Sequence, residues 1–177
     1  MEKRNTAGLK IAVTGPESTG KSLMAKYLAE RYNGIFVPEY AREYIQSIHR
    51  PYSYNDIEII ARQQVQQYNE WKNENAPVFF DTWLIITKVW FDWVYQRVPG
   101  WLEKSIYSCP IDLFLLMQPD IPWKADPARE NGGENRIKLY HRYKQELENY
   151  GFCYTEIGGT GTQRYRNAED EIERILK

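Results

Sequence analysis

A phosphate-binding pattern lies close to the amino terminus of the chain. The pattern G-x-x-x-x-G-K-[ST] is matched at every fixed position by Gly15-Pro16-Glu17-Ser18-Thr19-Gly20-Lys21-Ser22. A loop of this kind surrounds phosphates with backbone N–H groups, and glycines allow backbone angles that a β-carbon would obstruct. We therefore expect the loop to bind ATP. Lys21 is predicted to bridge the outer phosphates, and the hydroxyl of Ser22 to coordinate Mg²⁺.

One acid, Glu17, stands inside this anion-binding loop. Its charge has the same sign as that of the expected ligand, so its side chain must point outward, toward a metal, or toward a second substrate. The sequence leaves these three orientations open. Ser18 and Thr19 are expected to bind the phosphates with the rest of the loop.

Two further acids follow the next two predicted strands. Glu39 comes after 35–37, and Asp81 comes after 77–80. Ligands collect at the carboxyl ends of parallel strands, so both carboxylates are expected beside the phosphate loop. Phosphoryl transfer needs one carboxylate near the acceptor hydroxyl and one near Mg²⁺. We favour Glu39 as the base and Asp81 as the residue that binds magnesium or the sugar hydroxyls. The exchanged roles, and a helix N-cap for either residue, are the alternatives.

A long loop is predicted after the fourth strand. The stretch 118–135 contains three prolines and two adjacent glycines without periodicity, and loops of this length are usually functional or disordered. We expect a lid at about 119–136 that excludes water and supplies an arginine to the transferring phosphoryl group. Arg129 is the first candidate, with a solvated surface arginine as its alternative, and Arg136 is the second candidate. Trp123 could stack on a planar base or serve as a hydrophobic latch.

Strand and helix patterns alternate along the chain. Strands are predicted at 10–14, 35–37, 77–80, 113–117 and 152–157. Helices are predicted from Lys21 with Leu23 on the buried face, around 42–48, after a cap at Asn55, twice within 83–107, around 137–150, and after a cap at Asn167. This alternation predicts an α/β P-loop NTPase fold, with a five-stranded parallel sheet covered by helices on both faces. We expect one domain, 9–177, after a flexible stretch at 1–8.

Composition excludes several classes of protein. The 177 residues carry a formal net charge of −1, which offers no positive field for a nucleic acid or an anionic membrane. The longest apolar run has five residues, 113–117, against the roughly 20 needed to span a bilayer. We expect a cytoplasmic protein whose partner is a small-molecule nucleoside, with neither nucleic acid nor membrane. Cys109 and Cys153 are expected to be buried free thiols.

Missing motifs narrow the type of phosphate-loop protein. The chain has no N-K-x-D, no D-x-x-G after the third predicted strand and no L-S-G-G-Q. The first two belong to the guanine reader and switch of GTPases, so that class is excluded. A small chain with a single phosphate loop favours a small-molecule kinase.

Three further segments resemble a known family, the ribosylnicotinamide kinase domain of NadR-type proteins, from about Leu9 to the carboxyl terminus. They are Glu39-Tyr40-Ala41-Arg42-Glu43-Tyr44, Phe80-Asp81-Thr82, and Pro122-Trp123-Lys124-Ala125-Asp126 followed by Arg129. The resemblance implies ATP-dependent phosphorylation of nicotinamide riboside to nicotinamide mononucleotide. It implies a pyridine held between aromatic rings, here Trp123 and Tyr40. The substrate-binding residues that it implies are Glu39, Tyr40, Arg42, Asp81, Trp123 and Asp126.

The sequence departs from this family at one position. Trp83 stands where the family often has a second acid, two residues after Asp81. Two alternatives to a nicotinamide riboside kinase therefore remain. The acceptor could be another nucleoside or small metabolite, or the chain could be a regulatory module that binds ATP without transferring phosphate.

Overall fold

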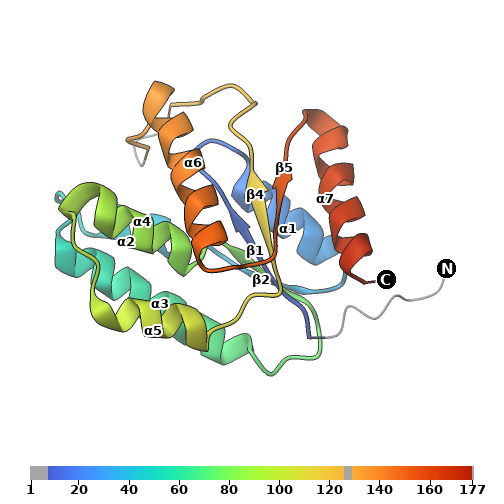
Figure 1. Ribbon diagram of the computed structural model, residues 1–177, viewed down its shortest axis with the longest axis horizontal. Coiled ribbons are helices and arrows are strands. Elements are labelled where there is room, and N and C mark those ends of the chain that lie inside the picture. Colours follow the sequence, from blue (N-terminus) through green and yellow to red (C-terminus); the bar gives the residue numbers. More distant parts are fainter. Residues whose placement is uncertain (1–7, 126–128, 177) are drawn as a thin grey trace.

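A single parallel sheet forms the centre of the molecule. The computed structural model describes residues 8–125 and 129–176. Within these residues the strands are β1 (Lys10–Thr14), β2 (Ile35–Val37), β3 (Val78–Asp81), β4 (Leu113–Met117) and β5 (Tyr154–Ile157). They pair in the order β2-β3-β1-β4-β5, and every pairing is parallel. The predicted P-loop fold with a five-stranded parallel sheet is confirmed (Figure 1).

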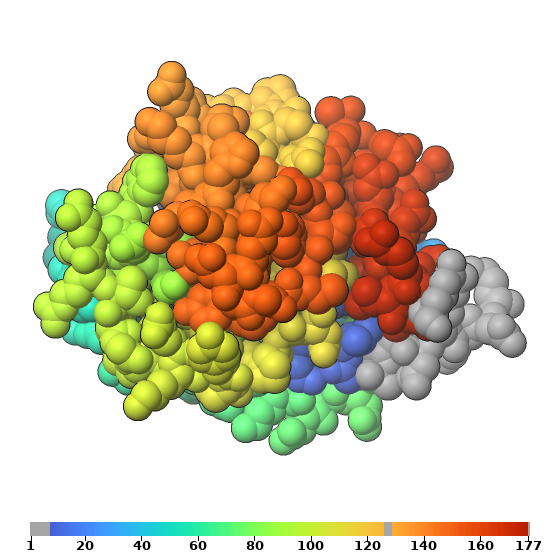
Figure 2. Space-filling model, viewed as in Figure 1, coloured from blue at the N-terminus to red at the C-terminus, as the bar shows by residue number. Residues whose placement is uncertain are grey.

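Helices cover the sheet on both faces. They are α1 (Lys21–Arg31), α2 (Tyr40–Ser47), α3 (Tyr54–Trp71), α4 (Leu84–Tyr95), α5 (Gly100–Ser108), α6 (Gly133–Asn149) and α7 (Gly161–Ile175). In Figure 1, α1 and α7 lie on one side of the sheet, and α3 to α6 lie on the other. Figure 2 shows the side chains of α6 in orange and those of α4 and α5 in green to yellow, forming a continuous surface on this face.

Alternate strand residues enter two separate cores. Phe114 and Leu116 of β4 join the core built with α3 to α6. Leu113, Leu115 and Met117 of the same strand join the core built with α1 and α7. Successive side chains of a strand point to opposite faces, so a fully apolar strand is what a sheet covered on both faces requires.

Two helices begin at residues other than the predicted caps. The N-cap of α3 is Ser53, which forms a capping box with Asp56, two residues before the predicted cap Asn55. Asp56 also accepts hydrogen bonds from Arg50 and Tyr44, and these bonds fix the capping box. The N-cap of α7 is Thr160. The predicted cap Asn167 lies inside α7, and its amide donates to the carbonyl of Gly158 at 3.0 Å.

Smaller predictions also need correction or lie outside the described residues. Leu23 was assigned to the buried face of its helix, but it is 67% exposed. Cys109 is buried as expected, whereas Cys153 is exposed. Residues 1–7 of the expected flexible stretch lie outside the described residues, and the N–H of Gly8 donates to the carbonyl of Asn75 at 2.7 Å. Among the helices described, none has the length and apolar character needed to cross a bilayer.

Candidate active site

The phosphate loop joins β1 to α1 and requires glycine at two positions. Gly15 has φ +137°, and a β-carbon there would lie 2.7 Å from the carbonyl oxygen of Met117. The loop therefore lies directly against the end of β4. Gly20 has φ +81° and is the N-cap of α1. Because the first N–H groups of a helix have no partner within it, α1 presents donors and a positive dipole end to this loop.

Lys21 places its ammonium group among three carboxylates. Its Nζ donates to the carbonyl of Pro16 at 2.9 Å, which holds the side chain along the loop. Burial lowers the pKa of Lys21, and the charges of Glu39, Asp81 and Glu17 oppose that change. The lysine is thus held where loop and acids converge.

Asp81 is the last residue of β3. Burial raises the pKa of Asp81, while hydrogen bonding with the Ser22 side chain and the Glu39 backbone and the charge of Lys21 act against this change. Its Oδ1 is buried, and no hydrogen-bond partner for it occurs in the described part of the chain. The N-cap of α4 is Trp83 and not Asp81. Asp81 and Ser22 therefore offer adjacent oxygen atoms beside the phosphate loop.

Glu39 precedes α2 and faces the same cavity. It occupies the N-cap position of α2 but makes no side-chain capping hydrogen bond. Its Oε2 lies 3.8 Å from Nε of Arg42. Burial raises the pKa of Glu39, and the positive charges of Lys21 and Arg42 act against this shift. A carboxylate with a raised pKa beside a phosphate loop is suited to accept a proton.

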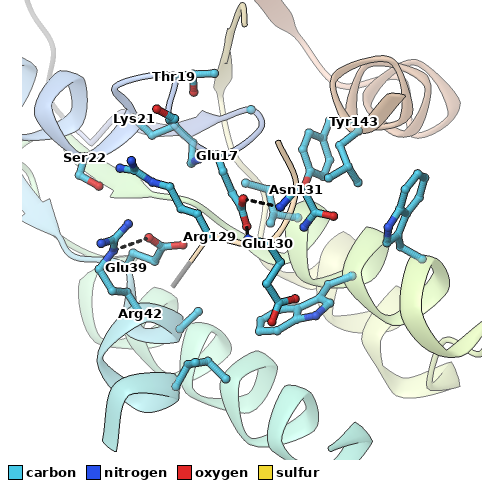
Figure 3. A pocket seen from close by; sticks show the side chains of 18 of the residues that line it. Glu17, Thr19, Lys21, Ser22, Glu39, Arg42, Arg129, Glu130, Asn131 and Tyr143 are labelled. Atoms are coloured by element: carbon cyan, nitrogen blue, oxygen red, sulfur yellow. Dashed lines mark hydrogen bonds and ion pairs between the residues drawn. The ribbon is translucent and has the colours of Figure 1, made fainter. Parts of the chain in front are cut away.

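One cavity of about 410 Å³ connects the phosphate loop with the lid and α4. The predicted site residues that line it are Gly15, Glu17, Ser18, Thr19, Gly20, Lys21, Ser22, Glu39, Arg42 and Arg129. Figure 3 shows Arg129 reaching toward the Ser22 side of the cavity, while Glu17 points toward Asn131 and Glu130. Loop and lid thus face one another across a shared space.

Four predicted residues lie away from this lining. Tyr40, Asp81, Trp123 and Arg136 are not among the lining residues. The Trp123 ring lies 5.9 Å from the guanidinium carbon of Arg136, and a β-carbon on Gly132 would come within 3.3 Å of it. The half-buried Trp123 ring therefore lies beside the start of α6, and both its stacking on a base and its role as a latch stay predictions. A fifth predicted residue, Asp126, lies outside the described residues.

Arg136 contacts the backbone of the phosphate loop and of the lid. Its guanidinium donates to the carbonyl oxygens of Glu17 at 3.0 Å, Ile121 at 2.8 Å and Ser18 at 2.6 Å. Its donors are directed to protein carbonyls, so it holds the loop and the lid together.

Part of the cavity is lined by aromatic side chains that the sequence analysis did not predict as site residues, and we call this part the aromatic wall. Tyr52, Trp90, Trp93 and Tyr143 line the cavity together with Ile86. The rings of Tyr52 and Trp90 meet edge to face with centroids 4.9 Å apart. The spacing of Ile86, Trp90 and Trp93 marks one face of a helix, but periodicity does not separate a core face from a pocket wall.

Arg164 of α7 was also missed, and nothing in the sequence pattern singled it out. It is buried, with a relative exposure of 5%. Its guanidinium donates to the carbonyls of Thr19 at 3.1 Å, Gln118 at 2.7 Å and Gly159 at 2.9 Å. It also forms an ion pair with Asp120. Arg164 therefore connects the phosphate loop with the loops that follow β4 and β5.

Comparisons with known proteins agree with this geometry. A family model described as "AAA domain" matches residues 10–164. The chain is 28% identical over 142 residues to the trifunctional NAD biosynthesis/regulator protein NadR of Salmonella typhimurium strain LT2. This alignment covers 77% of the chain and 35% of the relative. The chain thus corresponds to about a third of the length of the curated protein that it matches.

Two solved structures of NadR protein are similar in fold. The complex with NR has a TM-score of 0.76 at 23% identity and covers 97% of this chain and 51% of that one. The complex with NAD and AMP-PNP has a TM-score of 0.74 at 25% identity, and the match covers 97% of this chain and 50% of that one. These matches confirm the resemblance to the NadR-type kinase domain that the sequence motifs predict.

Proposed function

The chain belongs to the AAA domain family, whose model matches residues 10–164, and from this premise we propose that it is a kinase. It uses ATP and Mg²⁺ to phosphorylate the ribose hydroxyl of nicotinamide riboside, giving nicotinamide mononucleotide. Support comes from the similarity to NadR, a NAD biosynthesis/regulator protein, and from solved NadR complexes with NR and with AMP-PNP. We also propose that 9–177 form one kinase domain with a lid at about 119–136.

The observation that carries this proposal is the shared cavity. The phosphate loop opens into the same space as the aromatic wall of Tyr52, Trp90, Trp93 and Tyr143. Three carboxylates, those of Glu17, Glu39 and Glu130, line this space as well. Nicotinamide riboside carries a positive charge on its planar pyridinium ring. Aromatic faces and carboxylates both attract such a cation, whereas a neutral nucleoside gains only the stacking.

Nucleotide binding falls to the loop and the start of α1. Lys21 contacts the outer phosphates, and the N–H groups of the loop and of α1 surround the remaining oxygens. The Oδ1 of Asp81 is buried and has no hydrogen-bond partner among the described residues, and together with the nearby Ser22 hydroxyl it fits a hard cation. No cluster of three or more His, Cys, Asp or Glu side chains suited to a metal occurs within 8–125 and 129–176. That fits Mg²⁺, which takes few protein ligands together with substrate phosphates and serves to neutralise the phosphate charge.

Glu39 and Arg129 carry the transfer step. The carboxylate of Glu39 accepts the proton of the ribose hydroxyl while that oxygen forms a bond to the terminal phosphorus and the bond to ADP breaks. Arg129, whose side chain lines the same cavity, stabilises the charge on the transferring phosphoryl oxygens. The lid excludes water, which would otherwise accept the phosphoryl group.

Acceptor-dependent ADP release tests the proposal. The assay supplies Mg-ATP and, one at a time, nicotinamide riboside, adenosine, cytidine and thymidine, with mass spectrometry of the phosphorylated product. We expect nicotinamide riboside to stimulate ADP release most, and Lys21→Ala to abolish the stimulation. If nicotinamide riboside gives no more ADP than water while another nucleoside does, the acceptor is wrong. Calorimetric binding of Mg-ATP without turnover on any acceptor would identify a regulatory module instead.

A further inference from the structure

We propose that Glu17 is a positioning residue that docks the lid on the phosphate loop and thereby sets the place of Arg129. The two oxygens of its carboxylate accept separate hydrogen bonds from the lid backbone. The N–H of Glu130 donates to Oε1 at 3.3 Å, and the N–H of Asn131 donates to Oε2 at 2.9 Å. The inference rests on the proposed kinase activity, because it assigns a role in phosphoryl transfer.

The charge of Glu17 explains why the lid is the favourable partner. A carboxylate next to a bound triphosphate is repelled by it, and the repulsion grows in a site shielded from water. Two backbone donors on the lid attract the carboxylate and stabilise an orientation away from the phosphates. Figure 3 shows this orientation, with Glu17 directed toward Asn131 and Glu130. The sequence left three orientations open, outward, toward a metal or toward a second substrate; in the structure the carboxylate is directed to the lid backbone.

Further contacts hold the same two segments together. Arg136 donates to the backbone carbonyl of Glu17, so the residue is held through its main chain and its side chain. The N–H of Lys124 donates to Oγ of Ser18 at 3.0 Å. A separate contact joins the lid to the segment before α3, where the hydroxyl of Tyr52 donates to the carboxylate of Glu130 at 3.1 Å. Among these contacts, only those of the Glu17 carboxylate fix Glu130 and Asn131 through their backbone N–H groups.

Arg129 immediately precedes the residues that Glu17 holds. Its backbone position is therefore set within one residue of the docked segment, and its side chain lines the cavity. A displacement of about 1 Å in a catalytic group can lower a rate on the order of a hundredfold. Removing the Glu17 carboxylate should accordingly affect the rate through Arg129, with little effect on ATP binding by Lys21 and the loop.

A double-mutant cycle tests this route. Glu17→Ala should lower kcat on the order of tenfold or more and change the KM for ATP by less than about threefold. Glu17→Ala combined with Arg129→Ala should be no slower than Arg129→Ala alone, because both changes remove one contribution. The variants should also raise the ratio of ADP released to acceptor phosphorylated, since the open lid admits water. Losses in kcat that multiply in the double variant would overturn the inference.

Two further variants keep the test decisive. Glu17→Gln replaces Glu17→Ala as the test variant if the latter does not fold. It preserves the size of the side chain but leaves one carbonyl oxygen for two N–H donors, so we expect a smaller loss of kcat than complete removal of the carboxylate would give. Glu134→Gln is the matched control, because this acid lies in the first turn of α6, is 92% exposed and pairs only loosely with Lys138 at 3.9 Å. It should retain the wild-type kcat.

A readout without any acceptor separates this inference from the proposed function. Trypsin can cut the lid after Lys124 and after Arg129, and docking slows both cuts. We expect Glu17→Ala to be cut several-fold faster than the wild type, whether or not nicotinamide riboside is the acceptor. An unchanged cutting rate would show that Glu17 does not dock the lid. Faster cutting in a protein that phosphorylates no acceptor would contradict the proposed function alone.

Discussion

The guanidinium of Arg164 donates a hydrogen bond of 3.1 Å to the backbone carbonyl of Thr19, although α7 lies far along the chain from the phosphate loop. The same side chain reaches the carbonyls of Gln118 and Gly159. A loop that binds phosphate through backbone N–H groups depends on where its peptide planes point. A residue that fixes one of those planes from behind therefore belongs to the binding machinery without touching the nucleotide.

Replacement of Arg164 should weaken nucleotide binding. Arg164→Ala removes the hydrogen bonds to three backbone carbonyls and the ion pair with Asp120. We expect the Kd of Mg-ATP, measured by calorimetry, to rise on the order of tenfold, which corresponds to a loss of about 1.4 kcal/mol of binding free energy. Arg166→Ala, on the exposed side of α7, is the control and should bind as the wild type does. An unchanged Kd in Arg164→Ala would remove it from the binding machinery.

Loss of Arg129 should slow the chemical step. Arg129→Ala is expected to lower kcat on the order of a hundredfold or more, as arginines that contact a transferring phosphoryl group do. The Kd of Mg-ATP should change little, because the loop and Lys21 provide the ground-state contacts. Arg129→Lys retains the positive charge but lacks the planar guanidinium group, so its kcat should lie between those of the wild type and Arg129→Ala. Steady-state kinetics with full substrate titrations decide this; an unaltered kcat in Arg129→Ala excludes the role.

The activity should depend on the protonation of Glu39. Burial raises the pKa of Glu39, and a base acts only when ionised. As the pH decreases, kcat/KM is therefore expected to fall. Because the pKa of Glu39 is raised, this fall should begin at a higher pH than it would for an ordinary glutamate, whose pKa is about 4.3. Glu39→Gln should lower kcat on the order of a hundredfold or more and remove this acid limb from the pH profile. A limb that persists in Glu39→Gln would assign it to another group, with Asp81 the first to examine.

The aromatic wall should govern binding of the acceptor. Trp90→Ala removes a ring that lines the cavity and touches Tyr52. Base stacking on an aromatic side chain is worth about 1 to 3 kcal/mol, which corresponds to roughly 5- to 150-fold in the KM for the acceptor. The KM for ATP should stay the same. Trp101→Ala on α5, whose ring lies under Arg62 at 4.2 Å, is the control and should leave the acceptor KM unaltered.

Asp56 should stabilise the fold in a pH-dependent manner. Its hydrogen bonds with Arg50, Ser53 and Tyr44 hold the pKa of Asp56 well below its usual range. A depressed pKa adds stability that is complete above the unfolded value, about 3.9, and is lost progressively as the pH falls from there toward the lower folded value. Asp56→Asn should cost about 2 kcal/mol of unfolding free energy at pH 7, from the lost cap and the unpaired donors.

Chemical denaturation measured at several pH values tests this effect. The difference between Asp56→Asn and the wild type should shrink as the pH falls below about 4. Asn55→Ala changes the residue that the sequence suggested as the cap, and its unfolding free energy should match that of the wild type. A large loss in Asn55→Ala would restore Asn55 as the cap.

The sequence predicted the central elements because their signals are local. A fully apolar strand such as 113–117 and a phosphate loop between strand and helix each declare themselves within a few residues. The predictions of helix starts were wrong where contacts with residues distant in the sequence determine the structure. Arg50 and Tyr44 converge on Asp56 and fix the start of α3 at Ser53 in place of Asn55. No short-range pattern predicts such a convergence.

The candidate site divides in the same way. The loop residues and Glu39 could be placed from motifs, since each follows a strand of the parallel sheet. Trp123 was predicted either to stack on a planar base or to serve as a hydrophobic latch, and its ring lies beside Arg136 and Gly132 at the start of α6. The aromatic wall comes from α4, α6 and the segment before α3, which meet only in the folded chain. Arg164 reaches the loop from the last helix, and its sequence neighbours carry no sign of that contact.

Helix α6 extends along both halves of the cavity. Near its beginning Arg136 grips the carbonyls of the phosphate loop, and two turns later Tyr143 forms part of the aromatic wall. One helix therefore contacts both the phosphate loop, through Arg136, and the wall of the acceptor side, through Tyr143. Where binding of one ligand shifts this helix and changes the affinity for the other, thermodynamic reciprocity requires the second ligand to change the affinity for the first by the same factor.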